Sequence, residues 1–224
     1  MDKNWFRKTT WSKVDADDFY ARLGRSRDKE QMLAIQSGTL YSQNQKELDK
    51  ASLELIQKYF ADFPNDDWYM TSMLNRAANI YERKGDVKNA ELFFKKAADQ
   101  EIRIPNFRCD AYLDYSEFVL KNQLKSLYAE TEELLGKHEV GIPNPKMSHI
   151  PPYTSFNLPV QKYRAYSCLA ILHHFKGNKE KARHYKSLAE NATNATESGF
   201  VKSKTEGLVE QRDKVIDKLL KDIR

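Results

Sequence analysis

The residues with the clearest capacity for chemistry are three histidines near the end of the chain, His173, His174 and His184. Imidazole is a common metal ligand, but adjacent side chains on a helix diverge by about 100°, so His173 and His174 cannot bind one ion from a single face. The positions three and four residues after them hold no carboxylate that could complete a site. We therefore expect no metal site, with one histidine packed between helices and another on the surface.

Two cysteines, Cys109 and Cys168, are the candidate nucleophiles, and each lies within an apolar helical pattern. A reactive thiol needs a neighbouring base or cation, and neither cysteine lies in a local signature of that kind. Because no C-x-x-C motif occurs, we expect free, buried thiols in a reducing compartment. The glycine-rich phosphate-binding motifs are also absent from the sequence. We therefore predict no catalytic residue, no cofactor and no enzymatic activity.

Charge is spread along the chain instead of being gathered in one place. The 37 basic and 32 acidic residues give a net charge of +5 and are interleaved almost everywhere. We interpret the most basic stretch, 176–186, as a solvated helix face, and we do not expect nucleic acid as a partner. The N-terminus has no apolar stretch of signal-peptide length, and no run reaches about 18 apolar residues. We therefore expect a cytoplasmic protein with no membrane partner.

Hydrophobic residues make up 40% of the chain and recur with a helical period almost throughout, which is typical of an all-α protein. Gly24 is expected to end the first helix. The predicted helices cover 15–23, 28–41, 45–61, 67–83, 86–101, 107–121, 124–138, 159–176, 178–193 and 203–223. The apolar stripe of the last helix is Leu208, Val215, Ile216, Leu219 and Leu220.

Five of the seven prolines lie in one segment, 141–159, together with apolar residues that include Ile150, Tyr153 and Phe156. A solvated linker has no use for apolar side chains, so we expect an ordered, extended segment packed along the helices. The predicted organisation is an N-terminal arm with a short helix (1–27), helical hairpins (28–140), the proline-rich segment (141–159), and a last hairpin with a C-terminal capping helix (160–224).

Two stretches of the chain share a spacing of small residues. In each, an alanine is followed after seven residues by a glycine, after five more by an alanine and after seven more by another alanine. Small residues let two antiparallel helices approach closely, and glycine can adopt the left-handed backbone of a tight turn between them. The two sets are Ala78, Gly85, Ala90 and Ala97, and Ala170, Gly177, Ala182 and Ala189.

At these residues the sequence resembles the tetratricopeptide repeat (TPR). The match is closest over 73–97, where Leu74, Tyr81 and Phe94 also fit the pattern, and it is weaker over 166–189. The resemblance implies a right-handed α-α superhelix of TPR-like helical hairpins. A capping helix at the C-terminus would then cover the apolar face of the last repeat.

Two further units, 31–61 and 108–135, fit the repeat only by helix length and apolar spacing. In the second of them Asn122 stands where the turn glycine is expected. The two ends of the chain also resemble an uncharacterised group of bacterial proteins with degenerate repeats, which implies no particular activity. The residues that carry this resemblance are Trp5, Phe6, Thr10 and Trp11 at the start, and Ser198, Gly199, Phe200, Gly207, Leu208 and Val209 near the end.

In TPR proteins the first helices of successive repeats line a concave groove, where asparagines often hydrogen-bond the backbone of a bound extended peptide. Asn75 and Asn79 lie one turn apart on such a helix. The resemblance therefore implies a ligand groove, beside which the segment 141–159 could lie. The residues placed in this groove are Ser72, Asn75, Asn79, Glu82, Tyr112, Ser116, Arg164, Ser167 and His174.

We predict a non-catalytic scaffold that binds a protein or peptide through this groove. One alternative is a structural subunit or an immunity-type inhibitor that uses another face. The two asparagines would then be ordinary surface residues or form a hydrogen bond between helices. A nucleic-acid-binding or metal-dependent helical protein is the remaining alternative, which the motifs favour least. The sequence leaves the partner, the biological process and the oligomeric state open.

Overall fold

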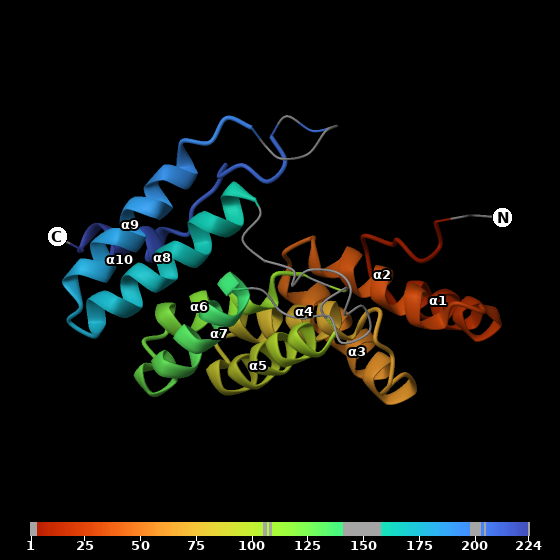
Figure 1. The fold of residues 1–224 in the computed structure, drawn as a ribbon. Helices are drawn as coiled ribbons and strands as arrows, with labels where there is room; N and C mark the ends of the chain where they lie inside the picture. The colour runs from red at the N-terminus through yellow and green to blue at the C-terminus, as the bar shows by residue number, and fades with distance from the viewer. Residues whose placement is uncertain are drawn as a thin grey trace, which may run out of the picture. The chain divides into compact units, whose positions relative to one another are not determined.

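A computed structural model describes residues 4–104, 107, 109–140, 158–197, 203 and 205–223. These residues form ten α-helices and one short 3-10 helix and contain no β-strand, so the predicted all-α class is confirmed. The chain divides into two compact units, residues 1–101 with 107–109, and residues 102–106 with 110–224 (Figure 1). Within the described part, none of the helices has the length and apolar character that a membrane crossing requires.

The first unit holds its helices around a core of large apolar side chains. Phe19, Leu33 and Tyr59 have no exposed surface at its centre. The rings of Trp5 and Trp11 lie 5.4 Å from that of Phe19, so the N-terminal arm packs onto the first helix. The helices are α1 (Lys13–Arg25), α2 (Lys29–Tyr41), α3 (Lys46–Asp62), α4 (Met70–Arg83) and most of α5 (Val87–Arg103).

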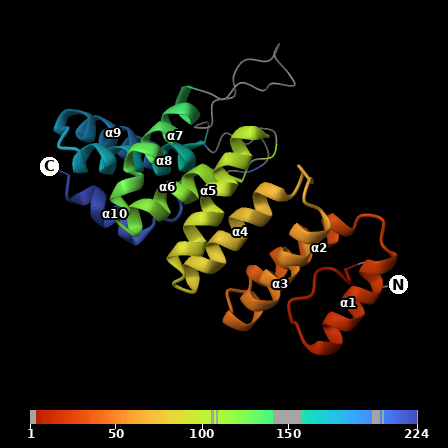
Figure 2. The same ribbon diagram turned by 90° about the horizontal axis from the view of Figure 1, so that it is seen from below.

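The second unit consists of two helix pairs and a short last helix. Neighbours in sequence pack together, α6 with α7 and α8 with α9, as α2 does with α3 in the first unit. The last helix, α10, packs against α8 and α6, which are the first helices of the two pairs (Figure 2). The elements are α6 (Ala111–Lys121), the 3-10 helix η1 (Lys125–Leu127), α7 (Tyr128–Val140), α8 (Pro159–Phe175), α9 (Lys179–Thr193) and α10 (Lys214–Lys221).

The two hairpins that share the alanine and glycine spacing also share their turn. Gly85 and Gly177 have left-handed backbones, with φ of +74° and +76°. The amide of Asp86 donates to the carbonyl of Tyr81 at 3.0 Å, and the equivalent bond after Gly177 measures 2.9 Å. Such a bond satisfies a carbonyl that the end of the helix would otherwise leave open. The predicted left-handed turn glycines are therefore confirmed.

The six alanines of the repeated spacing are fully buried, and none of them has any exposed surface. The second helix of each hairpin begins with a side-chain cap. Asp86 Oδ1 accepts from the amide of Asn89 at 3.2 Å, and Asn178 Oδ1 accepts from the amide of Lys181 at 3.1 Å. The buried alanines are Ala78, Ala90, Ala97, Ala170, Ala182 and Ala189.

The turn between α6 and α7 is built in the same way without a glycine. Its left-handed residue is Gln123, with φ of +53°, and the amide of Leu124 donates to the carbonyl of Val119 at 3.0 Å. Asn122, which the repeat alignment placed at the turn position, has an ordinary φ of −91° and its Nδ2 donates to the carbonyl of Phe118. The predicted position of this turn is therefore wrong by one residue.

Several predicted helix boundaries differ from the observed ones. Gly24 does not end the first helix, which continues to Arg25, because a single exposed glycine costs a helix only about 1 kcal/mol. The last helix begins at Lys214 and not at residue 203, because Asp213 caps it by accepting from the amides of Val215 and Ile216. Of the predicted stripe, Ile216 and Leu220 are buried.

The proline-rich segment 141–159 lies outside the described residues as far as residue 157. Its predicted order, and its predicted place beside a groove, therefore stay predictions. The described part of the chain resumes at Leu158, directly before Pro159, which occupies the first turn of α8.

Candidate functional site

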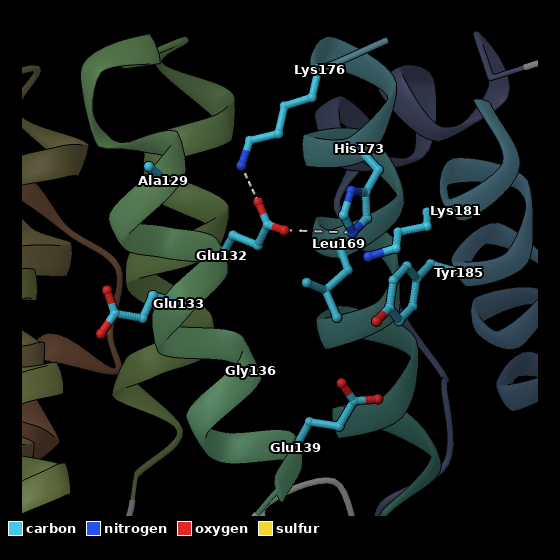
Figure 3. Close-up of a pocket in the computed structure, with 10 residues that line it drawn as sticks. All are labelled: Ala129, Glu132, Glu133, Gly136, Glu139, Leu169, His173, Lys176, Lys181 and Tyr185. Carbon is cyan, nitrogen blue, oxygen red and sulfur yellow. Dashed lines mark hydrogen bonds and ion pairs between the residues drawn. The ribbon is translucent and has the colours of Figure 1, made fainter. Parts of the chain in front are cut away.

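The second unit contains a pocket of about 430 Å³ between α7, α8 and α9 (Figure 3). The residues that line the pocket on each helix are mostly three, four or seven positions apart, and residues with this spacing share one face of a helix. Helix α7 contributes Ala129, Glu132, Glu133, Gly136 and Glu139, α8 contributes Leu169, His173 and Lys176, and α9 contributes Lys181 and Tyr185.

The upper part of the pocket in Figure 3 is a charge network around Glu132. Its carboxylate pairs with the ammonium of Lys176 and lies 3.7 Å from Nε2 of His173. Burial lowers the pKa of the His173 imidazole; Glu132 opposes this shift, whereas Lys181 and Lys176 add to it. The imidazole is therefore neutral near pH 7, and its ring stacks almost parallel on that of Tyr185 at 5.4 Å.

The lower part of the pocket combines aromatic rings with a carboxylate. The ring of Tyr185 also stacks on that of Tyr166, at 6.0 Å. Burial raises the pKa of both phenols, and the nearby carboxylate of Glu139 raises both further. In Figure 3 the Tyr185 hydroxyl points toward the part of the pocket where Glu139 lies.

Two charged groups of the pocket are not used by the fold. Among the described residues, neither Glu139 nor Lys181 forms a side-chain hydrogen bond or an ion pair. Glu133 differs, because it pairs with Lys137 at 2.8 Å and points away from the hollow (Figure 3). The pocket therefore offers one negative and one positive group to a ligand, beside the aromatic ring of Tyr185.

The sequence prediction about the three histidines did not include the carboxylate that lies beside His173. No carboxylate follows the histidines along α8, but Glu132 reaches His173 from α7. Of the other two, His174 and His184 are exposed. Within the described part of the chain, no three His, Cys, Asp or Glu side chains are grouped so as to hold a metal ion.

The cysteines are free in the structure and lie outside the pocket. Cys168 is fully buried, and burial raises the pKa of its thiol well above the usual value. Cys109 is only partly buried, and its backbone amide donates to Glu101. The predicted burial is therefore complete at one cysteine and partial at the other.

Four of the predicted groove residues lie on α4 in the first unit. The side chain of Ser72 donates to the carbonyl of Tyr69 at 2.9 Å, and Glu82 is partly buried. Asn75 is only 9% exposed, and Asn79 Nδ2 donates to its carbonyl at 2.8 Å. The two asparagines thus interact with each other along one helix, and this bond is not the predicted alternative of a hydrogen bond between helices.

The other five predicted groove residues lie in the second unit. Arg164 is held by two carboxylates, Asp114 at 2.5 Å and Glu117 at 2.7 Å, and His174 is exposed. The remaining three have no exposed surface, so in this structure they present nothing to a ligand: Tyr112, Ser116 and Ser167. That the nine residues form one groove stays a prediction.

Comparison with family models, curated proteins and solved structures gives no match for this chain.

Proposed function

We propose that this protein is a non-catalytic scaffold that binds a peptide or a segment of a protein, and that the pocket between α7, α8 and α9 takes a basic side chain of that ligand. The observation that carries the proposal is the carboxylate of Glu139, which lies beside Tyr185 and forms no ion pair among the described residues. A guanidinium or ammonium group could pair with this carboxylate and lie against the aromatic ring.

The second unused charge of the pocket favours a peptide over a simple cation. Lys181 lies close enough to His173 to influence its titration, at the other side of Tyr185 from Glu139 (Figure 3). Its ammonium could pair with a carboxylate of the peptide, or donate a hydrogen bond to a backbone carbonyl next to the basic residue. A pocket of about 430 Å³ has room for one long side chain and the adjoining backbone.

The proposal includes the finer architecture implied by the repeat resemblance, a right-handed superhelix of TPR-like hairpins. It is supported by the shared turn at Gly85 and Gly177 and by the buried alanines on either side of each turn. Helical hairpins of this kind build extended binding surfaces in repeat proteins, although a fold by itself assigns no function.

The test is a selection from a random peptide library displayed on phage, with the full-length chain as bait. We expect enriched peptides to carry Arg or Lys, and Glu139→Gln to weaken them about tenfold or more, because a hydrogen bond to a charged group contributes about 1.5–3 kcal/mol. Glu133→Gln on the same helix is the matched control and should leave affinity unchanged. Failure to enrich any peptide would contradict the function, whereas enriched peptides insensitive to Glu139→Gln would contradict the site.

A further inference from the structure

The last helix of the chain covers a specific surface of the second unit. Helix α10 packs against α6 and α8, the first helices of the two pairs of the second unit (Figure 2). Tyr112 and Ser116 on α6 and Ser167 on α8, which the sequence placed in a ligand groove, are fully buried. The structure thus shows this surface, which we call the α6–α8 face, already occupied by a helix of the same chain.

The occupant is strongly amphipathic. Ile216, Leu220 and Ile223 lie four and three residues apart on one side, and they are 1%, 6% and 3% exposed. Val215 on the same helix is 46% exposed. An apolar stripe with this spacing is how a helical ligand commonly enters a hydrophobic groove.

Polar contacts fix the orientation of α10. In each of them the donor or cation belongs to the rest of the second unit, and the acceptor belongs to α10 or to a residue close to one of its ends. The hydroxyl of Tyr163 donates to Asp217 at 2.6 Å, and the ammonium of Lys121 lies 3.6 Å from Asp213. At the other end Lys186 donates to the carbonyl of Ile223 at 2.8 Å. The α6–α8 face therefore combines an apolar centre with a phenol and a cation that each pair with a carboxylate of α10 or its N-cap, and Lys186 of α9 holds the end of the segment by a backbone carbonyl.

Two features of α10 would allow it to detach from the α6–α8 face. A helix of eight residues is not stable in water by itself, so α10 depends on the face for its structure. The residues that separate it from α9, 194–213, form no helix where they are described, so α10 could leave without unwinding α9. Ordering the backbone of α10 costs conformational entropy, and burying Ile216, Leu220 and Ile223 gains free energy of a comparable size. The net free energy that holds α10 on the face is therefore small.

We propose that the α6–α8 face is a helix-binding surface and that α10 is its built-in, displaceable occupant. The partner it fits is an amphipathic helix of another protein, with aliphatic residues at positions i, i+4 and i+7 and carboxylates at i−3 and i+1, as α10 and its N-cap have around Ile216. The proposal concerns a different surface from the pocket and does not depend on it.

The test uses the full-length chain and a fluorescent synthetic peptide of residues 205–223 as the probe. The double variant Ile216→Ser, Leu220→Ser should release α10, and we expect it to bind the peptide at least tenfold more tightly than the wild type. Val215→Ser, at the exposed position of the same helix, should behave as the wild type. A peptide with Asp213→Asn and Asp217→Asn should bind the double variant at least tenfold more weakly.

Absence of peptide binding to a double variant that circular dichroism shows to be folded would overturn the proposal. So would concentration-dependent dimers of the wild type, because they would indicate that the face takes α10 from a second copy. Hydrogen exchange of the wild type decides the case in which the double variant does not fold. We expect the amides of 216–221 to exchange at least tenfold faster than those of α6 and α8, and exchange at the same rate would mean that α10 is permanent core.

Discussion

The guanidinium of Arg76 on α4 lies directly over Gly38 on α2, where the Cβ of any other residue would come within 2.9 Å of Arg76 Nη2. The other terminal nitrogen, Nη1, donates to the carbonyl of Ala34 at 3.0 Å and to the hydroxyl of Ser37 at 2.6 Å. Burial lowers the pKa of Arg76 to about 10. A glycine inside a helix is unfavourable, and here it makes room for a partly buried cation that joins α2 to α4.

This relationship predicts that Gly38→Ala depends on what stands at position 76. In the wild type the new methyl group should displace Arg76 from its bonds to α2 and lower the free energy of unfolding. In an Arg76→Met background the same change should raise it by about 1 kcal/mol, the intrinsic advantage of alanine over glycine in a helix. Urea unfolding of the wild type, the two single variants and the double variant measures this double-mutant cycle. Equal effects of Gly38→Ala in the two backgrounds would contradict a steric conflict between the new methyl group and Arg76.

Two glycines of the second unit should respond in opposite directions to alanine. Gly177 has a left-handed backbone, so Gly177→Ala should destabilise by roughly 1–2 kcal/mol. Gly136 lies within α7 with no atom within 4 Å of an added Cβ, so Gly136→Ala should stabilise by about 1 kcal/mol. Denaturant midpoints provide the measurement, and a shift of the same sign for both variants would be inconsistent with the turn geometry.

The buried alanines should not tolerate larger side chains. Ala90 and Ala182 have no exposed surface, so Ala90→Leu or Ala182→Leu should each cost roughly 1–3 kcal/mol by overpacking. Ala61→Leu and Ala129→Leu are the matched controls at exposed helix positions, and both should stay near the wild-type melting temperature. Unchanged melting temperatures for both buried variants would argue against close hairpins.

Acidification should destabilise the second unit through His173. Because burial lowers the pKa of this imidazole below its ordinary value of 6.5, its contribution to stability is fully present above about pH 6.5 and is lost as pH falls through the lowered pKa. Glu132, Lys176 and Lys181 face the ring and contribute to the balance. Unfolding free energies at pH 7.5 and 5.0 should therefore differ less in His173→Gln than in the wild type.

The exposed residue His184 supplies the control for this pH effect. A His184→Gln variant should keep the difference between the two pH values seen in the wild type. If His173→Gln also keeps the full difference, other groups are responsible for the acid sensitivity.

Interactions between residues close in sequence could be predicted from the amino-acid order. The recurrence of apolar residues at a helical period indicated each of the ten α-helices that the described residues form, although not where the last one begins. The spacing around Gly85 and Gly177 placed two turns correctly. Both features depend on backbone geometry within a few residues, where steric rules act without help from the rest of the chain. Gln123 shows the limit of this reasoning, because a left-handed turn formed there at a residue that gives no glycine signal.

The candidate site depended on contacts between distant parts of the chain. Glu132 and His173 lie on different helices, and only their packing brings the carboxylate within 3.7 Å of the imidazole. The same is true of Arg76 beside Gly38 and of Tyr163 beside Asp217. The sequence alone therefore determined the helices and the turns of the repeated spacing, because these are set by local backbone energies. The tertiary structure decided which charges meet, which predicted groove residues are buried and where α10 binds, because these follow from packing between helices far apart in sequence.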